Sequence, residues 1–119
     1  MRTIIIAALA TGLAVPALAQ QPQQQGTASY YNGGQDGRTV TKSGKPVEPD
    51  KNTAASRDLP LGSHATVTNQ RTGRSTDVEI TDRGPTRTDR QIDVSRKAAQ
   101  DLGMTQSGTA PVTVDPKGR

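Results

Sequence analysis

Short stretches of alternating apolar and polar residues dominate the middle of the chain. Residues 63–69 (SHATVTN) and 74–81 (RSTDVEIT) alternate with the period of two that is typical of half-buried strands. Residues 70–73 (QRTG), between them, fit a hairpin turn. Two further stretches, 27–31 (TASYY) and 110–114 (APVTV), are also β-prone. The pattern therefore predicts several short strands connected by turns.

One segment, residues 95–102, has the spacing of a helix. Ser95 can cap its N-terminus, and Gly103 can end it. The apolar positions fall on one side of this helix: Ala98, Ala99 and Leu102. Many short strands with a single short helix indicate an all-β protein, a small β-barrel.

The N-terminus has the layout of a secretory signal peptide. A basic start precedes an apolar run at residues 4–15, and Ala17 and Ala19 form a small-x-small cleavage site. The alternative is a membrane anchor, but the apolar run is shorter than the ~20 residues that span a bilayer. We therefore expect an exported protein, cleaved after Ala19. Because no Cys adjoins the cleavage site, we expect no lipid anchor and no integral membrane segment in the mature form.

Composition sets the expected domain boundaries. Residues 20–25 (QQPQQQ) are polar and predict a disordered linker, residues 26–115 one small barrel domain, and residues 116–119 a C-terminal tail. The chain has no Cys and one His, so thiolate zinc sites and multi-His metal sites are excluded, and we expect neither a metal nor a cofactor. The formal net charge of +4 is modest and interspersed, which argues against nucleic acid as a partner.

Six segments occur in an order that is similar to that of the rare lipoprotein A (RlpA) family. They are GTASYY (26–31), TKSGKPVEPDKNTAASRDLPLGS (41–63), VTN (67–69), ITDRGP (80–85), IDVSRKAAQDLGM (92–104) and GTAPVTV (108–114). The resemblance implies a six-stranded double-psi β-barrel. It also implies an endolytic peptidoglycan lytic transglycosylase, which cuts glycan strands without hydrolysis, leaves 1,6-anhydro ends and prefers strands without stem peptides. Peptidoglycan glycan strands would be the substrate, and divisome or septal proteins the partners.

The same resemblance assigns roles to particular residues. The acidic position of the family's DRGP turn falls on Asp82, which becomes the expected catalytic acid/base. Tyr30 keeps the family's aromatic position, whereas Lys45 and Ser56 stand where the family usually has Glu and His. We expect Tyr30, Ser56, Lys45 and Arg83 to bind substrate.

Each of these assignments has a structural alternative. Asp82 can instead bond backbone N–H groups in its turn or pair with Arg83. An ammonium group at Lys45 would favour ionised Asp82, a poor acid, if it lies nearby, but Lys side chains usually point to solvent. The replacements at Lys45 and Ser56 keep a second function open, an inactive barrel that binds peptidoglycan or a septal protein. A third is an exported effector resembling expansins and barwins.

The remaining polar residues receive structural interpretations. Tyr30 and Tyr31 alternate, so one should face the core and the other the cleft or solvent. Asp93 precedes the predicted helix and is interpreted as structural. Asp89 and Arg90 are interpreted as a solvated loop tip, and His64 as an exposed strand residue without a chemical role.

Overall fold

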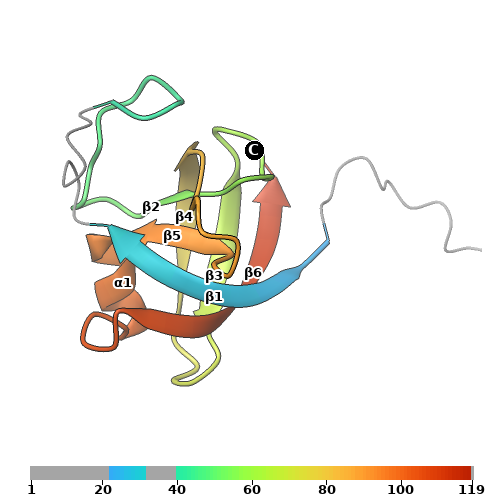
Figure 1. Ribbon diagram of the computed structural model, residues 1–119, viewed down its shortest axis with the longest axis vertical. Helices are drawn as coiled ribbons and strands as arrows, with labels where there is room; N and C mark the ends of the chain where they lie inside the picture. The colour runs from blue at the N-terminus through green and yellow to red at the C-terminus, as the bar shows by residue number, and fades with distance from the viewer. Residues whose placement is uncertain (1–21, 32–39, 119) are drawn as a thin grey trace, which may run out of the picture.

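The computed structural model describes residues 22–31 and 40–118 (Figure 1). The expected signal peptide and the loop at residues 32–37 lie outside these residues. In the part that is described, six strands and one helix follow one another: β1 (Gln24–Tyr31), β2 (Thr53–Ala55), β3 (His64–Asn69), β4 (Ser75–Asp82), β5 (Ile92–Ser95), α1 (Arg96–Leu102) and β6 (Thr109–Gly118).

The six strands close into a barrel in the order β1-β5-β2-β4-β3-β6. Two of the pairings are parallel, β1 with β5 and β2 with β4, and the others are antiparallel. In Figure 1 the helix α1 lies beside the barrel, near the end of β1. The predicted six-stranded barrel with one short helix is confirmed. No helix among the described residues is long and apolar enough to cross a membrane.

The alternating patterns correspond to the observed strands. The segments at 63–69, 74–81 and 110–114 become β3, β4 and β6, and the turn between β3 and β4 falls where the sequence predicts it. The helix is capped by Ser95, whose side chain accepts a hydrogen bond from the N–H of Ala98, and ends at Gly103 in the left-handed conformation. Local sequence therefore determines these elements.

The edges of the domain differ from the expected boundaries. The strand β1 begins at Gln24, and Gln24 and Gln25 pair with Val114 and Thr113 of β6. At the other end, β6 continues to Gly118 and pairs with β3 beyond residue 115. Residues with no strand pattern of their own are thus held in the sheet by their partners, which supply the backbone hydrogen bonds.

The core is built from small and medium-sized side chains. The longer strands contribute alternate residues to it, and the short strand β2 contributes Ala54. The helix α1 covers one side with its apolar face. The buried apolar residues are Ala28, Ala54, Ala55, Leu59, Ala65, Val67, Val78, Ile80, Ile92, Val94, Ala98, Ala99, Leu102, Met104, Ala110, Val112 and Val114. Because the chain has no Phe or Trp, this core depends on close packing of aliphatic groups.

The hydroxyl of Ser95 joins three separate segments. Its Oγ donates to the backbone oxygen of Lys51 at 2.6 Å and accepts from the N–H groups of Thr53 (3.3 Å) and Ala98 (3.2 Å). Ser95 is fully buried, so water cannot replace these bonds. One hydroxyl therefore fixes the helix start, the strand β2 and the chain that leads into it.

We predict that Ser95→Ala lowers the free energy of unfolding by ~1–3 kcal/mol, because it removes a helix cap and leaves buried backbone groups without partners. Urea unfolding measures the change. The matched control is Ser75→Ala, at an exposed position of β4, which should stay within ~0.5 kcal/mol of the unmodified protein. An equally small effect at Ser95 would show that the hydroxyl does not hold these segments together.

Candidate active site

A register shift in the sheet turns Asp82 toward the outside of the barrel. On β4, Ile80 points into the core, so simple alternation would point Asp82 inward as well. The pairing with β2 shifts at this point: Ala54 pairs with Ile80, and Ala55 pairs with Asp82. Since directly paired residues share a face of the sheet, Asp82 lies on the outer face with Ala55.

The same outer row continues across two more strands. Ala55 also pairs with Asp93 of β5, and Asp93 pairs with Ser29 of β1. The Ser29 hydroxyl donates a hydrogen bond to Oδ1 of Asp93 at 3.1 Å. Two aspartates, Asp82 and Asp93, therefore lie on one face, separated by a single residue of β2.

The carboxyl group of Asp82 is held by the backbone. Its Oδ1 accepts hydrogen bonds from the N–H of Arg83 at 2.9 Å and from the N–H of Lys42 at 3.1 Å. Its side chain is covered, with Asp82 only 5% exposed. Beside it, Gly84 has a φ of 140°, and a Cβ built there would meet Ala55 at 3.8 Å, so the loop backbone packs closely over the row.

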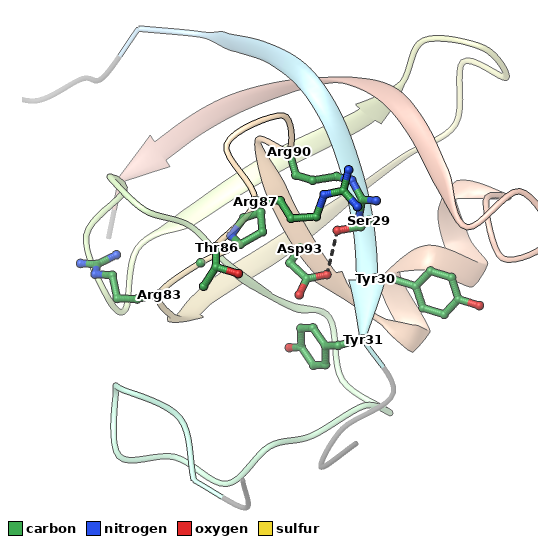
Figure 2. A pocket seen from close by; sticks show the side chains of 10 residues that line it. Ser29, Tyr30, Tyr31, Arg83, Thr86, Arg87, Arg90 and Asp93 are labelled. Carbon is green, nitrogen blue, oxygen red and sulfur yellow. Dashed lines mark hydrogen bonds between the residues drawn. The ribbon is translucent and has the colours of Figure 1, made fainter. Parts of the chain in front are cut away.

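An open cleft of about 320 Å³ adjoins this row on the side of Asp93 (Figure 2). The cleft is bordered by the end of β1, by Asp93 and by the loop that follows Asp82. Its lining consists of Ser29, Tyr30, Tyr31, Arg83, Gly84, Pro85, Thr86, Arg87, Arg90 and Asp93. Asp93 is thus a cleft residue in addition to any structural role, and Arg90 belongs to the cleft wall instead of a solvated loop tip.

The two tyrosines point in different directions. The Tyr31 hydroxyl lies 2.7 Å from Oγ1 of Thr53, and its ring faces the cleft in Figure 2. Tyr30 packs partly against the core, and its hydroxyl donates to the backbone oxygen of Thr105. The expected division between core and cleft is observed, and Tyr31, rather than the expected Tyr30, presents its ring to the cleft.

Burial raises the pKa of the Tyr31 phenol, against the opposing hydrogen bond with Thr53. The negative charges of Asp93 and Asp82 raise this pKa further. Tyr31 therefore stays a neutral hydrogen-bonding group at neutral pH.

Ser56 and Arg83 stabilise one turn. The Ser56 hydroxyl accepts from the N–H groups of Asp58 and Leu59 and donates to Oδ1 of Asp58. The Arg83 guanidinium donates to the backbone oxygens of Ser56 at 3.0 Å and Leu59 at 2.6 Å. Ser56 is 1% exposed and does not line the cleft, whereas Arg83 borders it with a side chain that is already bonded.

Lys45 forms its ion pair with Glu79 and not with Asp82. Its ammonium group forms an ion pair with Glu79 at 2.6 Å, with half of the lysine side chain exposed. Lys45 does not line the cleft. Of the five sequence-derived site residues, Tyr30 and Arg83 border the cleft, Asp82 lies beside it under the loop, and Lys45 and Ser56 lie outside it.

Arg57 holds the loop that forms the cleft wall. Its Nη1 donates to the backbone oxygens of Pro85 (2.7 Å) and Arg87 (3.2 Å), and its Nη2 donates to that of Arg90 (2.8 Å). The loop is therefore anchored at three carbonyl groups. Within residues 22–31 and 40–118, no group of three His, Asp or Glu side chains is arranged to hold a metal ion.

Comparison with known proteins identifies the family. The family model described as lytic transglycolase, a double-psi barrel domain, matches residues 23–114. The chain belongs to this family, and its curated relatives are named RlpA. The chain is 48% identical over 97 residues to a probable endolytic peptidoglycan transglycosylase RlpA of Nostoc, covering 80% of the chain and 26% of the relative.

Other relatives agree. The endolytic peptidoglycan transglycosylase RlpA of Neisseria meningitidis is 44% identical over 77% of the chain and 38% of the relative, and that of Pseudomonas aeruginosa is 43% identical over 76% and 26%. The chain thus spans between about a quarter and two fifths of these relatives' lengths.

Solved structures share the fold. The expansin of Clavibacter michiganensis superposes with a TM-score of 0.64 at 22% identity, covering 81% of this chain and 50% of that one. The Streptomyces papain inhibitor superposes equally well, with a TM-score of 0.64 at 19% identity, over 81% and 94% of the two chains.

We predict that Tyr31 makes the folded state less stable at alkaline pH. In the unfolded chain a Tyr ionises near pH 10, whereas the folded state holds the Tyr31 proton more tightly. The stability contributed by the protonated phenol is complete below about pH 10 and is lost as the pH rises through the raised pKa of the folded state. Tyr31→Phe should remove this alkaline loss, seen as a flatter unfolding midpoint from about pH 9 to about pH 11.

Spectrophotometric titration gives the direct check, because the chain has two Tyr and no Trp. The component with the raised pKa should vanish in Tyr31→Phe and persist in Tyr30→Phe. If it survives in Tyr31→Phe, the burial of this phenol is not the cause.

Proposed function

We propose that this barrel is a peptidoglycan lytic transglycosylase that cleaves glycan strands endolytically. The observation that carries the proposal is the row of two aspartates, Asp82 and Asp93, on one outer face beside an open polar cleft. Relatives that are 43–48% identical are named peptidoglycan transglycosylases, which supports peptidoglycan as the substrate and transglycosylation as the reaction. The cleft, bordered by the Tyr31 ring and hydroxyl-bearing side chains, suits a sugar chain, on which aromatic rings stack.

The reaction requires one proton donor that later acts as a base. Asp82 in its acid form protonates the glycosidic oxygen, and the C1–O bond breaks. The 6-hydroxyl oxygen of the same muramic acid residue then bonds to C1 and gives its proton to the carboxylate, which leaves a 1,6-anhydro end and regenerates the acid. The nucleophile belongs to the substrate, so no second carboxylate and no activated water are consumed.

The bonds around Asp82 suit this role. Its Oδ1 accepts hydrogen bonds from the backbone N–H groups of Arg83 and Lys42, so we assign the transferable proton to Oδ2. Two backbone donors also fix the orientation of the carboxyl plane, which a positioned acid needs. Tyr31 and Asp93, on the cleft side of the row, are proposed to contact the sugar, together with Tyr30 and Arg83 at the cleft border.

The substrate determines where the protein acts. Peptidoglycan lies outside the cytoplasmic membrane, so we propose that residues 1–19 are the export signal, removed after Ala19. Septal or divisome proteins are the partners suggested by the family resemblance.

We predict that Asp82→Asn abolishes 1,6-anhydro ends while the barrel stays folded, because Asn keeps the Oδ1 acceptor but cannot deliver a proton. The assay incubates residues 20–119 with purified glycan strands that lack stem peptides, and mass spectrometry detects the ends. Asp115→Asn, at an exposed residue of β6, is the matched control and should retain full activity.

Asp93→Asn completes the design. Cleavage that survives in folded Asp82→Asn but disappears in Asp93→Asn would transfer the acid role to the cleft carboxylate. Loss of stability by ~1–3 kcal/mol in Asp82→Asn, without loss of cleavage, would make Asp82 a structural residue of its turn. If the unmodified protein binds the strands but forms no anhydro ends, the barrel is a peptidoglycan-binding protein without cleavage activity.

A further inference from the structure

Three arginines line the cleft, and two of them are already bonded to the protein. The Arg83 guanidinium donates to two backbone oxygens. The Nε and Nη2 atoms of Arg87 donate hydrogen bonds to Oδ1 and Oδ2 of Asp89, at 3.0 and 2.8 Å. These hydrogen bonds hold the pKa of Asp89 below its usual value. The half-buried Arg90 differs: in the described part of the chain its guanidinium donates no hydrogen bond and forms no ion pair.

The backbone of Arg90 is nevertheless fixed. Its carbonyl accepts from Nη2 of Arg57 at 2.8 Å, and its N–H donates to the backbone oxygen of Arg87 at 3.2 Å. In Figure 2 the side chains of Arg87 and Arg90 both extend toward β1 near Ser29. An arginine on an anchored backbone needs little further ordering when it binds a ligand, which favours recognition.

An unpaired guanidinium in a cleft can bind a planar anion, because two of its N–H groups can donate parallel hydrogen bonds to the two oxygens of a carboxylate. Asp89 pairs with Arg87, so among the described residues no carboxylate is left as an ion-pair partner for the Arg90 guanidinium. A neutral sugar chain does not require such a group. The ligand of Arg90 is therefore expected to be a carboxylate carried by the glycan.

We propose that Arg90 binds the lactyl carboxylate of a muramic acid residue, an inference that rests on peptidoglycan being the substrate. Muramic acid alternates with glucosamine along the strand, so this carboxylate recurs at every second sugar. Binding it at Arg90 sets the register of the strand and selects which of the two kinds of glycosidic bond lies at the aspartate row. The carboxylate is ionised only where no stem peptide is amide-linked to it, so a contact with Arg90 supplies a physical cause for the preference for peptide-free strands that the family resemblance implies.

Calorimetric binding tests the proposal without depending on cleavage. The ligands are a peptide-free glucosamine–muramic acid tetrasaccharide, the same compound with its carboxylates converted to primary amides, a peptide-bearing form, and chitotetraose. The unmodified protein should bind the free carboxylate form ~10-fold more tightly than the amide form, in line with one charge-assisted hydrogen-bonded pair. Arg90→Gln should remove this preference, and Arg90→Lys should restore part of it.

Arg71→Gln is the matched control for charge. It makes the same substitution in the turn before β4, at the opposite end of that strand from the cleft loop. It should bind all four ligands as the unmodified protein does. Because the Arg90 guanidinium has no partner in the described residues, Arg90→Gln should keep the unfolding midpoint, so a loss of preference cannot come from unfolding.

Several outcomes overturn the proposal. One is a carboxylate preference that survives in Arg90→Gln or disappears equally in Arg71→Gln. Another is failure of the unmodified protein to bind the carboxylate form at millimolar concentration. An Arg90-dependent preference for the peptide-bearing form alone would transfer the contact to a stem-peptide carboxylate. The proposed function fails separately: a barrel that shows the Arg90-dependent preference but forms no anhydro ends binds the strand without cleaving it.

Discussion

Ala55 is the position on which the geometry of the site depends. It belongs to a strand of only three residues, yet it pairs with Asp82 on one side and with Asp93 on the other. The register shift beside it places Asp82 on the outer face instead of in the aliphatic core, where an unpaired carboxylate would be very costly. A small side chain here also allows the backbone at Gly84 to pack over the row. Ala55 therefore contacts or pairs with both the cleft wall at Gly84 and the two strands that carry Asp82 and Asp93.

Hydrogen bonds from the segments around this row make it rigid. The N–H groups of Lys42 and Arg83 orient the Asp82 carboxyl, and Arg57 anchors the loop that bears Arg87 and Arg90. Most of these bonds involve backbone groups, so they fix the positions of the loops independently of the ligand. Arg90 differs because its backbone is anchored while its guanidinium has no hydrogen-bond or ion-pair partner among residues 22–31 and 40–118.

The sequence predicts the elements whose signal is local. Alternation gives β3, β4 and β6, and the Ser95 cap gives the helix. It does not reveal β2, because three residues are too few to show a period, nor the polar start of β1 at Gln24, whose strand conformation depends on pairing with β6. The DRGP turn leads to Asp82 through a family pattern. From the sequence, Asp93 and Arg90 receive only structural interpretations and the choice between Tyr30 and Tyr31 stays open, because only the closed barrel brings β1, β5 and the loop together.

In the proposed mechanism, glycan binds along the row of Asp82 and Asp93 and in the cleft beside it. An NMR titration of Asp82→Asn with a peptide-free glycan tetrasaccharide tests this claim most directly, because binding is observed without cleavage. If glycan binds there, the largest amide shift changes fall on Ser29, Tyr31, Asp93 and the loop at residues 83–90. Changes concentrated instead on the outer face of β3 and β6, around Thr66 and Asp115, would contradict it.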